Sequence, residues 1–394
     1  MTDGFTLANL PYGSFRRGPD GPAKLCVRLG DDAIELGALS ARLPGIAPTL
    51  IDSPNLDRLL EADAAVWSEL RAGLQDVLSD GAPPEAGFPV SQAVACLPFT
   101  VRDYVDFYSS LQHATNLGRM FRPNSDPLLP NWRHLPVGYH GRSSTVVASG
   151  TPVRRPTGQR PGADGPTWGP SRRLDIELEL GFVTGGSPNP LGEPIPIAEA
   201  ERRIFGFVLV NDWSARDIQA WEYQPLGPFL GKSFATSVSP WVVPLAALES
   251  ARVPGPRQDP EPLQYLRSPE PRAFDVELEV LLRVKGQSEA HLIARTNARE
   301  LYWSAGQQLA HASSNGAIVS PGDLYASGTI SGSQPGAQGS LIELTWNGAH
   351  PIELGGVART FLEDGDTVMI SGWSSDVTSG DRVSLGVLSG QIVG

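Results

Sequence analysis

Three side chains that could perform acid–base chemistry lie close together near residue 110. Asp106 and Tyr108 are two residues apart in an extended stretch, so they project from the same face, and His113 follows within the first turns of a helix. A carboxylate, a phenol and an imidazole can therefore converge. The same spacing fits a solvated aspartate, a half-buried tyrosine and a histidine on a helix surface. Local spacing favours neither interpretation.

The segment Asp175–Leu180 alternates acidic and aliphatic residues, which predicts a strand with three carboxylates on one face. Three like charges repel one another unless a cation lies between them, and Ca²⁺ or Mg²⁺ prefers carboxylate oxygen. A solvated edge strand would show the same alternation. Because Asp275–Val280 repeats the pattern, alternation by itself is weak evidence for a metal site.

A further group of polar side chains follows a strand of the buried type, Phe205–Val210, which ends near Asp212. Ser214–Asp217 has the capping-box form that begins a helix. One stripe of that helix, at positions i, i+3 and i+7, consists of Arg216, Gln219 and Tyr223. An exposed helix normally mixes its charges. A surface helix with one aromatic anchor remains the alternative.

Lys232 is one of only three lysines in the chain, and it lies between apolar residues and Thr236. A partly buried ammonium is costly unless it has a function. Alternatively, its aliphatic stem packs on the surface while the charged group stays in water. The surrounding run Gly227–Ser233 is not a phosphate loop, because that motif needs four residues between its glycines and this run has three. No G-x-S-x-G element supports a serine nucleophile.

These residues must be positioned by a mostly β framework of the α+β class. The chain has 43 glycines and 36 prolines in 394 residues, and they fall mostly between short alternating segments. The first hundred residues should contain a hairpin of Lys24–Leu29 with Ala33–Leu36, and then a helical region from Ser53 to Gly81. A short strand, Val94–Phe99, precedes a domain boundary near residue 100.

The remainder, residues 101–394, should form one larger domain of strands with a few short helices. Two of these helices are expected at Ser109–Leu117, before Gly118, and at Ser214–Tyr223. The segments 155–170 and 255–272, rich in proline, glycine and arginine, should be long surface loops.

Composition limits the classes of partner. The net charge is −12 and the pI is near 5.0, so the long-range field repels nucleic acid and anionic membrane surfaces, and neither is an expected partner. No window of about 18 apolar residues predicts a membrane span, and Met1–Phe15 lacks the pattern of a signal peptide. Cys26 and Cys96 are too few for a disulfide framework. We expect a cytoplasmic protein.

Several longer motifs resemble the fumarylacetoacetase family. They are residues 106–116 (DFYSSLQHATN), 136–142 (PVGYHGR), 211–219 (NDWSARDIQ) and 327–332 (SGTISG), with 9–13 (NLPYG) near the start. The likeness covers essentially the whole chain. It implies a small SH3-like barrel in residues 1–100, a large β-roll-like catalytic domain in residues 101–394, and a homodimer.

The resemblance also implies an activity and a metal. The reaction would be hydrolysis of the carbon–carbon bond of 4-fumarylacetoacetate to fumarate and acetoacetate, the last step of tyrosine and phenylalanine catabolism. A divalent cation, usually Ca²⁺, would be held by acids that fall on Asp106, Glu177, Glu179 and Asp212. A further Mg²⁺ position is implied near Asp212, Lys232 and Thr236.

By the same resemblance, His113 would be the general base, held by Glu343 in an expected strand Leu341–Trp346, and would deprotonate water. The implied oxyanion-stabilising residues are Arg216, Gln219 and Lys232. The implied substrate contacts are Tyr108, Arg122, Tyr139, Gln219, Tyr223 and Thr329.

Two positions depart from the family pattern: Leu111 stands where a basic residue is usual, and Ala235 stands where glycine is common beside Mg²⁺. Two other functions are open. An acylpyruvate-type hydrolase of the same superfamily is disfavoured by the N-terminal unit and by the implied substrate contacts. A catalytically inactive, metal-stabilised binding protein is disfavoured because it needs neither the base His113 with Glu343 nor the ammonium of Lys232.

Overall fold

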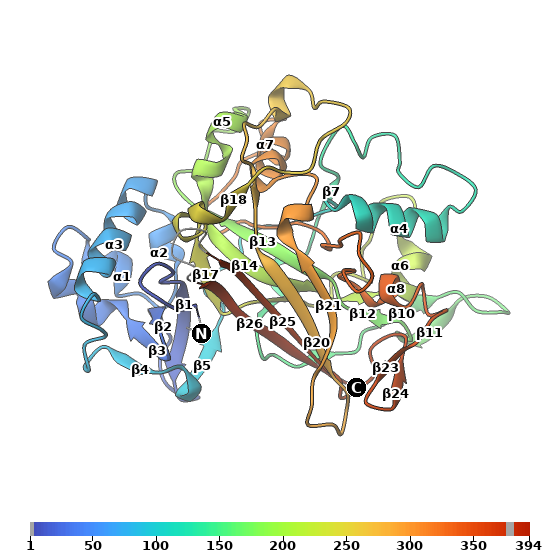
Figure 1. Cartoon of the computed structure of the whole chain (residues 1–394), viewed down its shortest axis with the longest axis horizontal. Helices are drawn as coiled ribbons and strands as arrows, with labels where there is room; N and C mark the ends of the chain where they lie inside the picture. The colour runs from blue at the N-terminus through green and yellow to red at the C-terminus, as the bar shows by residue number, and fades with distance from the viewer. Residues whose placement is uncertain (1–3, 376–381) are drawn as a thin grey trace.

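The computed structural model describes residues 4–375 and 382–394 of the chain. Strands predominate, as the sequence predicts, and the helices are short and lie around the sheets (Figure 1). The first hundred residues contain β1 (Tyr12–Arg17), β2 (Lys24–Leu29), β3 (Asp32–Glu35), β4 (Gly87–Pro89), β5 (Ala93–Cys96), α1 (Pro48–Ile51), α2 (Asp57–Leu60) and α3 (Ala64–Val77).

The rest of the chain supplies the strands and helices that surround the candidate site. The strands are β6 (Tyr104–Phe107), β7 (Gly138–His140), β8 (Val146–Ala148), β9 (Val153–Arg154), β10 (Thr157–Arg160), β11 (Thr167–Pro170), β12 (Leu174–Asp175), β13 (Leu178–Thr184), β14 (Ile204–Asp212), β15 (Ser214–Ala215), β16 (Thr236–Val238), β17 (Trp241–Pro244), β18 (Arg252–Val253), β19 (Ala273–Phe274), β20 (Glu277–Arg283), β21 (His291–Asn297), β22 (Leu324–Ala326), β23 (Ile352–Leu354), β24 (Val357–Arg359), β25 (Thr367–Ser375) and β26 (Arg382–Val393). The helices are α4 (Leu111–Phe121), α5 (Ile197–Ala200), α6 (Arg216–Glu222), α7 (Ala305–Ser313) and α8 (Leu341–Leu344).

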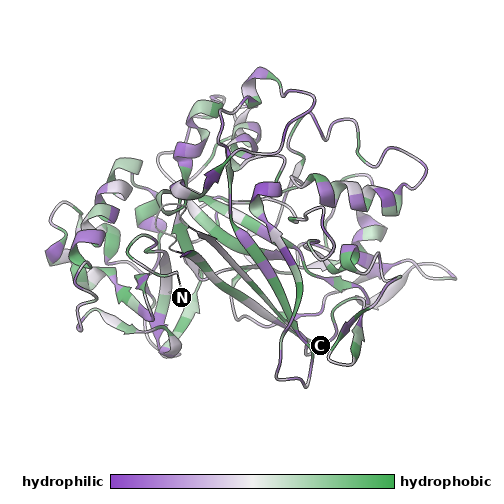
Figure 2. Cartoon of the chain, viewed as in Figure 1, coloured by the Kyte–Doolittle hydropathy of each residue, from purple (hydrophilic) through white to green (hydrophobic). Residues whose placement is uncertain are grey.

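Two large sheets form the centre of the molecule. A thirteen-stranded sheet has the order β4-β3-β2-β1-β17-β14-β13-β22-β6-β7, with β5, β8 and β16 attached beside this path. A five-stranded sheet has the order β21-β20-β25-β26-β9. All residues of β13 and β14 are buried, because these central strands are covered on both faces. In Figure 2, hydrophobic colours run along the central strands, whereas hydrophilic colours are frequent on the peripheral helices and loops.

The N-terminal strands are continuous with the sheet of the larger region. Strand β1 pairs antiparallel with β17, with Tyr12 opposite Val242 and Gly13 opposite Trp241. The thirteen-stranded sheet ends at β4 and β7, so no sheet closes on itself within the described residues. The mostly β, α+β class is therefore confirmed, whereas a closed N-terminal barrel is not seen.

The predicted hairpin is confirmed: β2 and β3 pair around Gly30, whose φ of 57° is easy only for glycine. The helical region is confirmed in part. The longest helix, α3, begins at Ala64 after the N-cap Asp63, so the predicted start at Ser53 is wrong. Residues 48–60 instead form two one-turn helices.

Helix α4 begins later and ends later than predicted. Ser110 is its N-cap, and the Ser110 hydroxyl accepts the backbone N–H of His113. The helix runs through Gly118 because that glycine serves a close approach and not a helix end. A Cβ there would lie 1.9 Å from the Pro127 carbonyl oxygen.

Three further local predictions are wrong. The segment 155–170 is not one loop, because β10 and β11 pair as a hairpin within it. Helix α6 begins at Arg216 with Ala215 as N-cap, so the capping box predicted at Ser214 does not form. Residues 341–346 are not a strand, since α8 occupies Leu341–Leu344.

No helix among the described residues is long and apolar enough to cross a membrane. Cys26 and Cys96 are both free thiols.

Candidate active site and metal centre

Four buried carboxylates converge on one point in the larger sheet. Asp106 lies on β6, Glu177 just before β13, Glu179 within β13, and Asp212 at the end of β14. One oxygen from each lies within 4.8 Å of the others. Strands β13 and β14 are hydrogen-bonded neighbours, and β22 joins β13 to β6, so the sheet brings together residues more than a hundred positions apart.

Asp175 does not belong to this cluster. Strand β12 ends at Asp175 and β13 begins at Leu178, so the residues between them break the predicted continuous strand. The Asp175 carboxylate instead pairs with the Arg216 guanidinium, with 2.8 Å between Oδ2 and Nε. The prediction of three carboxylates on one strand face is therefore wrong at Asp175.

Lys232 is the cation closest to the acid cluster. Its Nζ donates to Glu177 Oε2 and, at 2.8 Å, to Asp212 Oδ2. The residue is only 6% exposed, so the alternative of a solvated ammonium is wrong. Burial alone would lower the pKa of Lys232, but the negative charges of Asp212 and Glu177 outweigh burial and raise it, so the ammonium stays protonated.

The pKa values of three of these carboxyl groups are shifted in different directions. Burial raises the pKa of Asp106 and of Glu179 well above the usual range, and the charges of neighbouring acids raise both further. Burial also acts on Glu177, but Lys232 and Arg216 outweigh it and lower the pKa of this carboxyl. The ammonium of Lys232 thus compensates only part of the negative charge.

Two oxygens of the cluster have no hydrogen-bond donor among the residues that the structure describes: Asp106 Oδ1 and Glu179 Oε1. A buried, unpaired carboxylate oxygen is costly. Four carboxylates at this spacing provide the oxygen donors that Ca²⁺ and Mg²⁺ prefer. The residues present therefore fit a divalent cation at this point.

His113 and Glu343 form a buried pair beside the cluster. The Nδ1 atom of His113 lies 2.6 Å from Glu343 Oε2. Glu343 also accepts hydrogen bonds from Asn116 Nδ2 at 2.9 Å, Ser331 Oγ at 2.9 Å and Ser340 Oγ at 2.7 Å. Burial would raise the pKa of Glu343, but the charge of His113 and these hydrogen bonds outweigh it and lower the pKa. The carboxylate is held ionised against the imidazole.

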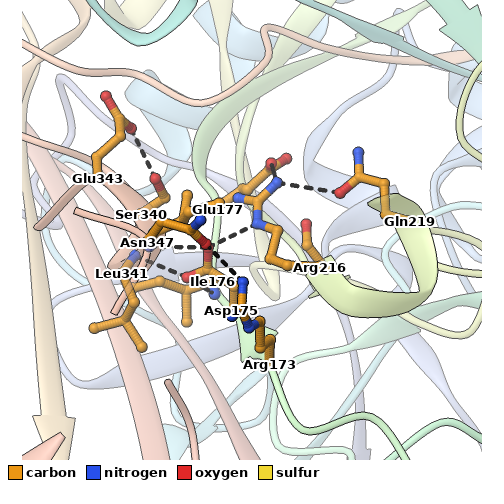
Figure 3. Close-up of polar contacts among 12 residues, drawn as sticks. Arg173, Asp175, Ile176, Glu177, Arg216, Gln219, Ser340, Leu341, Glu343 and Asn347 are labelled. Carbon is orange, nitrogen blue, oxygen red and sulfur yellow. Dashed lines mark hydrogen bonds and ion pairs between the residues drawn. The ribbon is translucent and has the colours of Figure 1, made fainter. Parts of the chain in front are cut away.

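Arg216 and Gln219 lie one turn apart on α6, and the Arg216 side chain points toward the acid cluster (Figure 3). Arg216 Nη1 contacts Glu177 Oε1 at 2.8 Å and donates to Gln219 Oε1 at 3.3 Å. Arg216 Nη2 is buried and has no acceptor within the described part of the chain. One guanidinium N–H group is therefore free to bind a ligand oxygen.

The structure places several other predicted residues around this centre. Tyr139 donates to Asp212 Oδ2 at 3.1 Å, and Thr236 Oγ1 donates to Asp212 Oδ1 at 2.6 Å. The Tyr108 ring lies edge-on to the His113 ring, with 5.3 Å between centroids. Thr329 Oγ1 is buried and without a partner in residues 4–375 and 382–394.

Arg122 and Tyr223 have no direct contact with the acid cluster among the described interactions. Arg122 Nη2 donates to the Pro127 carbonyl at 2.6 Å, and the charge of Arg122 opposes the effect of burial, which raises the pKa of Tyr108. Tyr223 follows α6 and is 46% exposed, in contact with the side chain of Gln224. The structure does not bring the Tyr223 side chain into a described contact with the cluster.

A cavity of about 310 Å³ opens beside the cluster. It is lined by Tyr139, His140, Gly141, Arg142, Ser143, Ser144, Pro228, Phe229, Lys232 and Ser233. Four residues of the run from Gly227 to Ser233 line one wall of this cavity. The amides at Phe229 and Gly231 donate to Glu222 Oε1, which agrees with the rejection of a phosphate loop.

Four residues in contact with the site were not predicted from the sequence. They are Asn116, Asp175, Ser331 and Ser340. Asn116 lies one turn after His113 on α4, and that spacing could have indicated it. Nothing in the local sequence distinguishes the two serines.

The departures from the family pattern have structural explanations. Leu111 packs against the main hydrophobic core, so it occupies this position with apolar contacts. Ala235 is 7% exposed and belongs to the same core.

Comparisons with known proteins identify the family of this chain. Residues 8–98 match the family described as Fumarylacetoacetase N-terminal, and residues 103–393 match Fumarylacetoacetate (FAA) hydrolase C-terminal. The fumarylacetoacetase of Rattus norvegicus is 50% identical over 408 residues, covering 99% of this chain and 96% of the rat protein. That of Arabidopsis thaliana is 44% identical over 409 residues, covering 99% and 96%.

Solved structures share the fold at much lower identity. Fumarylacetoacetate hydrolase from Exiguobacterium antarcticum has a TM-score of 0.57 at 17% identity, covering 98% of this chain and 99% of that one. Maleylpyruvate hydrolase from Sphingobium sp. SYK-6 has a TM-score of 0.54 at 16% identity, with the same coverage. The matches to the two family descriptions and to close relatives extend over nearly the whole sequence, and this chain therefore belongs to the fumarylacetoacetate hydrolase family.

Proposed function

We propose that this chain hydrolyses the carbon–carbon bond of 4-fumarylacetoacetate to give fumarate and acetoacetate, as the last step of tyrosine and phenylalanine catabolism. Relatives named fumarylacetoacetase, aligned over 99% of the chain, support this substrate. The observation that carries the proposal is the buried His113–Glu343 pair beside four converging carboxylates. A base next to a cation site can activate water for addition to a carbonyl group. Cleavage of the adjacent carbon–carbon bond then releases an enolate.

The four carboxylates would hold one divalent cation, Ca²⁺ or Mg²⁺. When bound, the cation supplies Lewis-acid polarisation and a template for the two keto oxygens of the substrate. We also propose a second Mg²⁺ position near Asp212, Lys232 and Thr236, at which residue 232 could contribute only its backbone carbonyl. The protonated ammonium of Lys232 has no lone pair to donate, whereas Thr236 Oγ1 donates its hydrogen to Asp212 Oδ1 and keeps its lone pairs for a cation.

His113 would take a proton from water through Nε2. Glu343 Oε2 lies 2.6 Å from Nδ1 and accepts a hydrogen bond from the Nδ1–H group. The neutral imidazole therefore presents Nε2 as the proton acceptor. Negative charge on Glu343 then stabilises the imidazolium that forms. The same proton can be returned from Nε2 to the departing carbon, which completes the hydrolysis.

Three groups would stabilise the oxyanion that forms when hydroxide adds to the carbonyl. Arg216 offers the unpartnered Nη2 group. Gln219 accepts from Arg216 through Oε1, which leaves its amide N–H₂ as a donor. Lys232 uses two of its three N–H groups on Glu177 and Asp212, so one remains.

The remaining predicted residues would bind the carboxylates and keto oxygens of the substrate. The proposed contacts are Tyr108, Arg122, Tyr139, Gln219, Tyr223 and Thr329. The buried, unpartnered atoms Arg122 Nε and Thr329 Oγ1 support this assignment, because each can still donate a hydrogen bond. Tyr223 would need to turn toward the cavity to take part.

We also propose a division into an N-terminal SH3-like unit, residues 1–100, and a β-roll-like catalytic unit, residues 101–394, assembled as a cytoplasmic homodimer. The two separate family matches, 8–98 and 103–393, support the boundary. Light scattering coupled to size-exclusion chromatography tests the dimer, and a monomeric mass at micromolar concentration would contradict it.

The function is tested by turnover. Purified protein with Mg²⁺ or Ca²⁺ should bleach the ultraviolet absorption of fumarylacetoacetate while fumarate and acetoacetate appear in equal amounts. Elemental analysis of the same sample identifies the cation. A metal-loaded preparation that leaves fumarylacetoacetate intact would remove the assignment.

A further inference from the structure

Asp175 is a fully buried carboxylate that has no part in the chemistry described above. Its Oδ1 accepts N–H groups from Ile176 at 2.8 Å and Leu341 at 2.7 Å. Its Oδ2 accepts Arg216 Nε at 2.8 Å and the N–H of Ile342 at 3.1 Å. Figure 3 shows the carboxylate between the Arg216 side chain and the backbone near Leu341. Both oxygens are therefore saturated by donors from separate segments of the chain.

One of these segments carries Glu343 of the general-base pair. Leu341 and Ile342 are the first residues of α8, and their N–H groups have no acceptor within the helix. A carboxylate at this end satisfies them and is favoured by the helix dipole. Glu343 follows one residue later, and Ser340, just before the helix, donates to Glu343 Oε2. Asp175 thus holds the turn that presents Glu343 to His113.

The other segment carries the oxyanion donor. The guanidinium of Arg216 is planar and rigid, so a bond at Nε determines where both terminal nitrogens point. Nε is bound by Asp175 and Nη1 by Glu177, which fixes the orientation of the guanidinium and leaves Nη2 without an acceptor among the described residues.

We propose that Asp175 is a positioning residue that sets the separation between the oxyanion-binding guanidinium of Arg216 and the helix that carries Glu343. The inference rests on the proposed function and extends it to a residue outside the substrate contacts. Because both partners act on the transition state, loss of Asp175 should lower kcat and leave KM nearly unchanged. Partial unfolding also lowers the apparent kcat at constant KM, so kcat is expressed per folded, metal-loaded enzyme, and a residue that only stabilised the fold would leave that kcat unchanged.

The primary test is Asp175→Asn in the full-length, metal-loaded enzyme. The amide keeps the size of the side chain but turns N–H₂ toward two N–H donors. We expect kcat for fumarylacetoacetate to fall about 10- to 100-fold, KM to change less than about threefold and the metal content to stay unchanged.

Asp366→Asn is a matched control. Asp366 is also fully buried, accepts Arg359 Nε at 2.8 Å and two backbone N–H groups, and lies outside the site. This variant should lose stability in a similar way while kcat stays within about twofold of wild type. Equal kcat values for Asp175→Asn and Asp366→Asn would overturn the proposal.

A coupling measurement identifies the partner. In an Arg216→Gln background, Asp175→Asn should lower kcat further by a smaller factor than it does in the wild type, because one of the two groups that it positions is already absent. Independent, fully multiplied losses would contradict action through Arg216. If Asp175→Asn does not fold, Asp175→Glu, which keeps the charge and shifts the carboxylate, should show the same kcat loss; wild-type kcat in that variant would overturn the idea.

A spectroscopic test does not depend on turnover. The Arg216 Nε–H signal, identified by its absence in Arg216→Lys, should be protected from exchange in the wild type and unprotected in Asp175→Asn or Asp175→Glu. An unprotected signal in the wild type would contradict the positioning role even if fumarylacetoacetate is not the substrate. Inactive wild-type enzyme with a protected signal would instead remove only the proposed function.

Discussion

Two segments of this protein have nearly the same pattern and different roles. Asp175–Leu180 and Asp275–Val280 both alternate acidic and aliphatic residues. In the first, Glu177 and Glu179 are buried in the four-carboxylate cluster, and Glu179 Oε1 has no donor in the described structure. In the second, Glu279 forms an ion pair with Arg295.

The cross-strand neighbours explain the difference. On β20, Glu279 lies opposite Arg295 and Glu277 opposite Asn297, so each carboxylate has a donor on the adjacent strand. On β13, Glu179 lies opposite Val210, which has no donor to offer. An acidic strand can bind a cation where the neighbouring strands leave some of its carboxylate oxygens without a hydrogen-bond donor. The lack of a cross-strand donor, and not alternation along one strand, therefore distinguishes the candidate metal centre.

The largest predicted effect comes from substituting one glutamate in each of the two strands, Glu179 in β13 and Glu279 in β20. Glu179→Gln should lose the divalent cation and lower turnover at least about a thousandfold, because the Lewis acid contributes several kcal/mol. Glu279→Gln should retain both metal and turnover, since its partner is a surface arginine. Elemental analysis and the fumarylacetoacetate assay measure the two effects. Metal loss in Glu279→Gln would show that the two strands are not distinct in function.

The next prediction separates the base from the acid cluster. His113→Ala should keep the bound metal while turnover falls ~10²- to 10⁴-fold, the usual contribution of a general base. Asp106→Ala should lose both metal and turnover. The same metal stoichiometry assay applies, and equal metal loss in these two variants would contradict the division of roles.

The smallest predicted effect concerns Asp323, a buried carboxylate outside the cluster. Its Oδ2 accepts the Ser320 N–H at 2.8 Å, and burial raises its pKa to about 6 from 3.8. Since the folded-state pKa lies above the unfolded value, this group favours folding at low pH, and the contribution is lost as pH rises through about 4 to 6.

Asp323→Asn should remove that dependence and lessen the fall in unfolding free energy between pH 4 and pH 7 by about 1–2 kcal/mol. Urea unfolding at the two pH values measures it. A wild-type pH dependence that persists in the variant would show that burial without a cation does not perturb this acid.

The class of fold and most of the candidate site could be predicted from the sequence. The hairpin at Gly30 and the apolar spacing of α3 are local signals, and the structure confirms both. The likeness to a known family identified the acids at 106, 177, 179 and 212, which the sheet brings within 4.8 Å. What failed was local geometry around Asp175 and residues 341–346.

The alternation of apolar residues in 341–346 suggests a strand, yet the segment is a helix because a distant carboxylate accepts its first two N–H groups. Trp346 and Asn347 then end the turn with positive φ values of 48° and 57°. The predicted acidic face of Asp175–Leu180 is interrupted at its first residue, because β12 ends at Asp175 and β13 begins at Leu178.

By itself the sequence determined which residue types are available: the carboxylates, the imidazole, the rare lysine at position 232 and the alternation that makes strands. Tertiary structure decided which carboxylate meets a cation and which meets Arg216, because that choice depends on donors contributed by strands far away in the chain. Burial then made the choice energetically decisive, since an unpaired charge inside a protein is far more costly than the same charge in water.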